Sequence, residues 1–232
     1  MPLDVIRFKL FMKSAALNNI LAIRVQAVDG NVDDISGADV GATWNSHLNS
    51  RFDSSCKAND TLPLSPSERG CAASHIKVWR IIAQFGSSPN IFRSSSVEIN
   101  AFSLSSLSHQ LRVRVRDGNL DNSWFIICED DAKLVSSSLD ANFLGTISKI
   151  VALLPLDCDI CYLGHTIPRC AQNEIVSVRK AFFRPSYLWQ LHAYMIRPTT
   201  ARVLLSCVPV AEPVDNFLAR LIYEKRIVVK FC

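Results

Sequence analysis

The sequence predicts an α/β fold, in which helices pack on a β-sheet. Two observations lead to this prediction. Apolar segments with strand character alternate along the chain with segments of helical periodicity, as in sheets covered by helices. Hydrophobic residues also make up 49% of the 232 residues, enough to bury a sizeable core. No internal repeat interrupts this pattern.

The N-terminal quarter is predicted to contain three parts. Residues 5–18 have the pattern of a short amphipathic helix. The segment "AIRVQAVDG" (22–30) predicts a strand that ends in an Asp-Gly turn. Residues 31–62 are polar and are predicted to form a loop.

The clearest local signal is a helix in "LSPSERGCAASHIKVWRIIAQF". Ser65 suits the N-cap, Pro66 the first helical position, and Glu68 the partner position of a capping box. One face of the helix then carries four residues at helical spacing, which are Cys71, His75, Val78 and Ile82.

The second half of the chain supplies most of the predicted sheet. Strands are predicted in "LRVRVRDGN", "SWFIIC", "DICYLG", "YLWQLHAYMIRP" and "RIVVKF". Helices are predicted over residues 138–154, in "TTARVLLSC", and in "PVDNFLARLIYEK", where Pro213 starts the helix. Residues 86–109 are serine-rich and predict a surface loop.

Composition excludes several classes of function. The net charge is +4, which is smaller than expected for a nucleic-acid-binding protein with Lys and Arg clustered on one face. A mildly basic protein could also bind a small anionic ligand. No stretch has the length of a transmembrane segment, and charges interrupt any signal-peptide core. Eight cysteines show no framework spacing. Cys158 and Cys161 are expected on opposite faces of a strand, which makes a poor zinc clamp.

Three consecutive acids follow the apolar run in "FIICEDDAKL". On an extended backbone Glu129 and Asp131 point to one side and Asp130 to the other. Two carboxylates at the end of a strand suit a hard divalent cation, and ligands of α/β sheets bind at such ends. A solvated turn is the alternative, and the residues alone favour neither.

The other candidate residues each have a structural explanation beside the functional one. His75 could simply be a packed, hydrogen-bonded core residue, and the capping box alone accounts for Glu68. Asp215, in "EPVDNFL", is in the first turn of a helix, where the dipole favours a carboxylate. The alternating arginines of "LRVRVRDGN" could meet a diphosphate, but we favour a solvated strand face.

Several segments, taken in order, resemble glycosyltransferase family 25, which includes bacterial lipooligosaccharide and animal procollagen galactosyltransferases. The matching segments are "RVQAVDG", "LSPSERGCAASHIKVWR", "FIICEDDAKL", "DCDICYLG", "AYMIRPTTARVLL" and "PVDNFL". They cover most of residues 20–220. The resemblance implies a single domain over residues 1–232, with a serine-rich insertion at about 86–122. The implied fold is of the GT-A type, a Rossmann-like domain that binds a nucleotide-sugar donor.

The resemblance also implies roles for particular residues. Glu129 and Asp131 would hold Mn²⁺ or a similar cation against the diphosphate of a UDP-sugar, with Asp130 beside the cofactor. On the donor side the implied residues are Glu68, Ser74 and His75. Asp215 would be the general base of an inverting transferase, which moves a hexose, with galactose expected, to a hydroxyl of a glycan or glycoprotein.

The sequence departs from the family pattern in ways that bear on activity. The start, "MPLDVIRFKLF", holds no full copy of the family's first strand, so we expect a sheet that lacks this strand and binds nucleotide weakly. Arg69 stands where the family has an aliphatic residue, and Thr200 where it has a glycine.

A catalytically inactive binding or adhesion module is therefore the alternative function. A metal-dependent phosphohydrolase explains the acids but not the helix around His75. Eukaryotic relatives work in the secretory pathway, and the localisation of this chain stays open.

Overall fold

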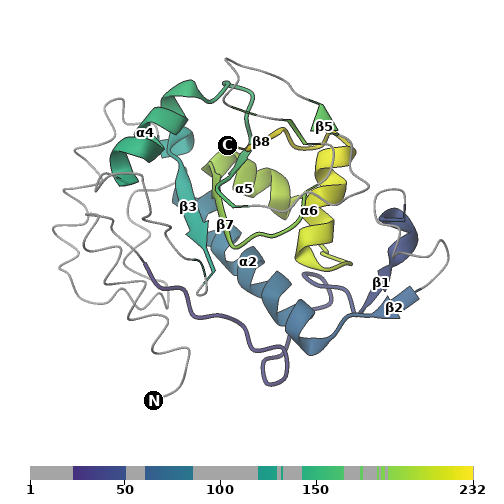
Figure 1. Ribbon diagram of the computed structural model, residues 1–232. Coiled ribbons are helices and arrows are strands. Elements are labelled where there is room, and N and C mark those ends of the chain that lie inside the picture. The colour runs from purple at the N-terminus through teal and green to yellow at the C-terminus, as the bar shows by residue number, and fades with distance from the viewer. Residues whose placement is uncertain are drawn as a thin grey trace.

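The computed structural model describes residues 23–50, 61–85, 120–129, 143–164 and 188–231, together with Ala132, Phe182 and the pairs 173–174 and 184–185 (Figure 1). These residues form a mixed α/β structure, which confirms the predicted class at that level. The predicted helix over 5–18, the serine-rich stretch 86–109 and the strand in "LRVRVRDGN" lie outside the described residues.

Four α-helices and eight short strands make up the described structure. The helices are α2 (Pro66–Phe85), α4 (Phe143–Leu153), α5 (Pro198–Leu205) and α6 (Val214–Tyr223), with 3₁₀ turns η1 (Ser46–Leu48) and η3 (Leu120–Asn122). The strands are β1 (Thr43–Asn45), β2 (Thr61–Pro63), β3 (Phe125–Cys128), β4 (Ile160–Tyr162), β5 (Asn173–Glu174), β6 (Arg184–Pro185), β7 (Ala193–Ile196) and β8 (Val229–Phe231). None of the helices in these ranges combines the length and apolar character needed to cross a bilayer.

The main sheet has four strands in the order β3-β7-β4-β8. Strand β7 is antiparallel to both of its neighbours, whereas β4 and β8 are parallel. Tyr194 of β7 pairs with Ile127 on one side and with Tyr162 on the other. Strands β3 and β4 therefore run in the same direction, and their carboxyl ends lie at the same edge of the sheet.

Side chains alternate between the two faces of this sheet, and each face is covered by helices. Ile127, Tyr162 and Tyr194 belong to the large core that α2, α5 and α6 complete. Cys161 and Met195 belong to a smaller core, completed by side chains of α4. The period-2 pattern of the strands thus places a helix layer on both sides of the sheet, as the sequence predicts.

The expected separation of Cys158 and Cys161 is wrong. Both are fully buried in the smaller core with Met195. Strand β4 begins only at Ile160, and Cys158 lies in the preceding turn, where its N–H donates to Pro155 O over 3.0 Å. Strand alternation therefore does not apply to this pair. Both behave as small apolar residues.

Helix α2 begins with the predicted capping box. The N–H of Glu68 donates to Ser65 Oγ over 3.2 Å, and the N–H of Ser65 donates to Glu68 Oε2 over 2.8 Å. Two backbone donors that the first helical turn leaves unpaired are satisfied in this way. Pro66 opens the helix at the position where its missing N–H removes no hydrogen bond.

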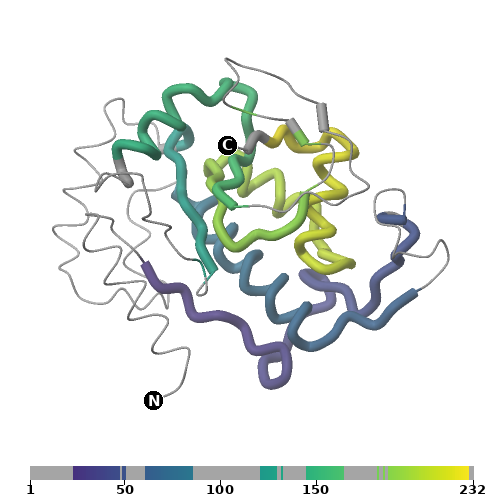
Figure 2. The backbone as a smooth tube through the Cα atoms, viewed as in Figure 1, coloured from purple at the N-terminus to yellow at the C-terminus, as the bar shows by residue number. Residues whose placement is uncertain are grey.

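The predicted strand over 22–30 is wrong, because residues 23–29 form no regular strand. The segment runs extended alongside α2 toward the β1–β2 hairpin (Figure 2). Side chains of α2 bond its backbone groups: the N–H of Val28 donates to Ser74 Oγ over 2.8 Å, and Lys77 Nζ donates to Gln26 O over 3.0 Å. The segment is extended but is not a strand, because these two backbone groups bond to side chains of α2 and not to a neighbouring backbone.

Two glycines allow the segment to approach α2 closely. A Cβ on Gly30 would lie 1.7 Å from Pro66 O, and one on Gly70 would lie 2.7 Å from Val28 O. Both clashes are with backbone atoms, which cannot rotate away. The glycines of "AVDG" and "RGC" are therefore explained by one contact between the two segments.

We expect Gly30→Ala to destabilise the protein by about 3 kcal/mol or more, because the added methyl group forces two backbones apart. Thermal unfolding of Gly37→Ala is the matched control, since a Cβ there would meet no atom within 4 Å. The control should change stability by less than about 1 kcal/mol. Equal melting temperatures for the two variants would contradict the packing of 23–30 on α2.

Candidate functional site

Three of the predicted residues come together at the carboxyl end of β3. His75 projects from α2, Glu129 follows β3 directly, and Asp215 lies in the first turn of α6. Glu129 Oε1 is 3.3 Å from His75 Nε2. Asp215 is close enough for the charges of both residues to act on its pKa. Residues far apart in the chain thus form one acidic site at the edge of the sheet.

A buried chain of hydrogen bonds holds His75 in place. Trp79 Nε1 donates to Tyr194 Oη over 2.9 Å, and Tyr194 Oη is 2.9 Å from His75 Nδ1. Every group is satisfied when the Tyr194 hydroxyl donates to Nδ1 and the Nε2–H of His75 donates to Glu129. Trp79, Tyr194 and His75 are all buried, so the imidazole is fixed in orientation.

The two carboxylates of the site have opposite pKa shifts. The hydrogen bond from His75 lowers the pKa of Glu129, against the effect of partial burial. Burial raises the pKa of Asp215, and the negative charge of Glu129 raises it further. Glu129 therefore stays ionised to lower pH than a free carboxyl, whereas Asp215 holds its proton to higher pH. Pairs of titratable groups with diverging pKa values are typical of catalytic sites.

The loop before β7 completes the surroundings of Asp215. The backbone of Gln190 donates a hydrogen bond to this carboxylate, and Gln190 has a φ of 74°, in the left-handed region. The ring of His192 packs against Gly164. A Cβ on Gly164 would lie 2.3 Å from His192 Nε2, so only glycine leaves room for the ring. The N–H of Glu129 donates to His192 O over 2.9 Å, which extends the β3–β7 ladder to the site.

Sequence reasoning missed Tyr194, His192 and Gln190 as parts of the site. Tyr194 is inside a predicted strand, and only the alternation of that strand places it on the face of α2. His192 and Gln190 also lie within the predicted strand "YLWQLHAYMIRP", but β7 begins only at Ala193, and both residues precede it in an irregular segment where strand alternation does not apply. No signal in the sequence pointed to these two.

Cys71 adds a third ligand type to the site. Its Sγ, a ring nitrogen of His75 and a carboxylate oxygen of Glu129 all lie within 4.8 Å of one another, so these residues could hold a metal ion. Cys71 is exposed as a residue, but desolvation of its thiol and the charges of Glu129 and Asp215 raise its pKa to about 12. The thiol therefore carries its proton at neutral pH.

We expect Cys71 to react slowly with iodoacetamide at neutral pH despite its exposure. A pKa of about 12 instead of 9.0 lowers the thiolate fraction by about a thousandfold, and the thiolate is the nucleophile. Mass spectrometry of alkylated peptides measures this rate. The same residue in urea-unfolded protein is the control and should react at the ordinary rate. Equal rates in the folded and unfolded states would show that neither burial nor the carboxylates raise the pKa of the thiol.

The remaining predicted residues are placed differently. Glu68 lies in the first turn of α2, where its carboxylate accepts hydrogen bonds from Ser65 in the capping box. Ser74 Oγ accepts from Val28 N–H and donates to Gly70 O, so it fastens the 23–30 segment. Asp130 and Asp131 lie outside the described residues. Roles of these four residues toward a donor stay predictions.

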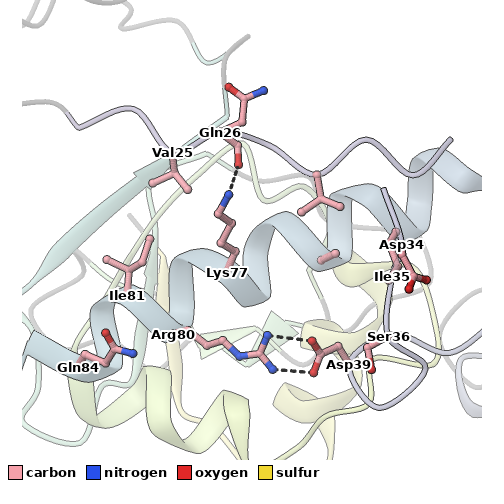
Figure 3. Close-up of a pocket in the computed structure, with 12 residues that line it drawn as sticks. Val25, Gln26, Asp34, Ile35, Ser36, Asp39, Lys77, Arg80, Ile81 and Gln84 are labelled. Atoms are coloured by element: carbon pink, nitrogen blue, oxygen red, sulfur yellow. Dashed lines mark hydrogen bonds and ion pairs between the residues drawn. The ribbon is translucent and has the colours of Figure 1, made fainter. Parts of the chain in front are cut away.

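A pocket of about 390 Å³ lies on the opposite face of α2, against residues 25–39 (Figure 3). Its two cationic side chains are engaged, since Lys77 bonds Gln26 O and Arg80 forms a two-pronged ion pair with Asp39. No group of three potential metal ligands lies in this pocket within the described residues. The acidic site is therefore the stronger candidate.

No protein-family model matches the sequence, and no curated protein matches it either. The resemblance to glycosyltransferase family 25 therefore rests on the motifs named above.

Proposed function

We propose that the protein is a metal-dependent glycosyltransferase that moves a hexose, with galactose expected, from a UDP-sugar to a hydroxyl of a glycan or glycoprotein. One observation supports this proposal most. His75, Glu129 and Asp215 come from three different segments of the family resemblance, and they meet at one sheet edge. The contact of Gly30 with Pro66 joins two of the resembling segments as well.

The residues present fit a divalent cation. Glu129 is held ionised by His75, and its side chain is 35% exposed, so an ion can reach it from solvent. Glu129 and the predicted ligand Asp131 would hold Mn²⁺, a cation that prefers oxygen ligands. The ion would supply positive charge beside the diphosphate as negative charge grows on the leaving oxygen.

Asp215 suits the role of general base. Its carboxylate is partly buried, and its raised pKa makes it a stronger proton acceptor than a solvated aspartate. The hydrogen bond from the backbone of Gln190 and the nearby His75 and His192 act in the opposite direction and lower this pKa. A base acts only in the ionised form, so transfer should increase as pH rises through the pKa of Asp215.

A screen of UDP-sugars tests the proposal. Purified protein is incubated with UDP-galactose, UDP-glucose and UDP-N-acetylglucosamine, with Mn²⁺ or with EDTA, and the released UDP is measured. We expect release from one donor that requires Mn²⁺. Mn²⁺-dependent binding of UDP without release from any donor would favour a catalytically inactive binding module. Absence of UDP binding would overturn both.

A further inference from the structure

We propose that Cys71, His75 and Glu129 form a binding site for a zinc-type divalent cation. The site shares Glu129 with the proposed Mn²⁺ site but differs from it in donor chemistry. Its existence does not depend on glycosyl transfer, because the ligands are defined by geometry alone.

Helix geometry places two of the ligands together. Cys71 and His75 are four residues apart on α2, so their side chains leave the same face about one turn apart. Glu129 meets them from the end of β3, with all three ligand atoms within 4.8 Å. A thiolate, an imidazole and a carboxylate are the zinc ligands of proteins, and three of them leave a fourth position for water or substrate. Thiolate and imidazole also favour Zn²⁺ over Mn²⁺.

The imidazole already has the support that metal-binding histidines require. An ion on Nε2 needs the proton on Nδ1, and Tyr194 Oη lies 2.9 Å from Nδ1 to accept it. The same oxygen accepts from Trp79 Nε1, and a hydroxyl oxygen has two acceptor positions. Tyr194 Oη can therefore partner Nδ1 without movement of either ring, as the donor in the metal-free protein and as an acceptor in the metal-bound one.

The position of Cys71 is unusual for a structural cysteine. Cysteines are normally buried as small apolar residues, as Cys158 and Cys161 are here. Cys71 instead lies outside both buried clusters, with its Sγ within 4.8 Å of ligand atoms of His75 and Glu129.

Cobalt is the probe that reads the thiol directly. Co²⁺ added to the purified, reduced protein should give a sulfur-to-cobalt charge-transfer band in the near ultraviolet, and Zn²⁺ should abolish it by displacement. Cys71→Ser should remove the band and weaken Zn²⁺ binding by more than about a hundredfold. Cys207→Ser is the matched control, because Cys207 lies at the end of α5, outside the triad, and it should keep the band.

Further measurements distinguish loss of the metal site from loss of folding and from loss of glycosyl transfer. Serine keeps the size of the cysteine side chain, so Cys71→Ser should leave circular dichroism and the melting temperature unchanged, whereas His75→Gln tests the second ligand if it folds. A band that persists in Cys71→Ser, or no band in the wild-type protein, would overturn the proposal. A Cys71-dependent band in a protein without UDP-sugar hydrolysis would sustain the metal site and count against only the transferase.

Discussion

Replacing Asp215 by asparagine is expected to lower the turnover of the UDP-sugar by about a hundredfold or more, while donor affinity is unchanged. Asparagine keeps the size of the side chain but cannot take a proton from the acceptor hydroxyl, and general base catalysis contributes roughly 10²–10⁴ in rate. A base acts in the transition state, so the effect should fall on kcat and not on donor binding. Steady-state kinetics with a saturating acceptor measure the change.

The pH profile gives this prediction a second readout. Burial raises the pKa of Asp215, so wild-type turnover should decline as pH falls through that raised value, and Asp215→Asn should lose this dependence. Asp121→Asn is the control, since it removes a carboxylate from a surface pair with Arg202. Turnover of Asp215→Asn within a few-fold of wild type would make Asp215 only a helix-start residue. Loss of folding would favour the same conclusion.

Replacing Glu129 by glutamine is expected to abolish most Mn²⁺-dependent binding of UDP, with an affinity more than about tenfold weaker. The amide is a poor ligand for Mn²⁺ compared with a carboxylate, but it can still accept a hydrogen bond from His75, so the fold should persist. Asp131→Asn should act in the same direction. Calorimetric titration of UDP in the presence of Mn²⁺ measures both variants.

The matched control for Glu129→Gln is Glu224→Gln at the end of α6. Glu224 forms an exposed pair with Arg220, and such surface pairs contribute about 1 kcal/mol or less. The control should bind UDP as wild type does. If Glu129→Gln retained full Mn²⁺-dependent affinity, the cation would have to be held by other residues, and the role assigned to the end of β3 would be wrong.

The sequence predicts best those elements that contacts between neighbouring residues determine. The capping box of Ser65 and Glu68 fixes the start of α2 through contacts three residues apart, so the sequence alone defines it. Tyr162 and Tyr194, by contrast, share a face because of the register between β4 and β7, which alternation within each strand does not determine. Residues 23–30 have the composition of a strand, but backbone groups of Gln26 and Val28 bond to side chains of α2, and no local pattern in the sequence predicts this.

The same distinction applies to the site. Glu129 was predicted because an acid at the end of an apolar strand is visible in the sequence. Asp215 was predicted only through the resemblance, because its position in the first turn of a helix is explained without a function. Their proximity to His75 and Cys71 depends on how α2 and α6 pack on the sheet, which no spacing in the chain encodes. The resemblance supplied an expectation that these segments meet, and the structure brings three of its residues together.

The most direct test of the account is a crystal structure of the protein with Mn²⁺ and UDP. We predict the cation at the carboxyl end of β3, with a carboxylate oxygen of Glu129 among its ligands, and the diphosphate between it and the first turn of α6. Asp215 should face the open side of the nucleotide, where an acceptor hydroxyl would enter. UDP bound instead in the pocket between residues 25–39 and the opposite face of α2, or a cation that Glu129 does not touch, would contradict the account.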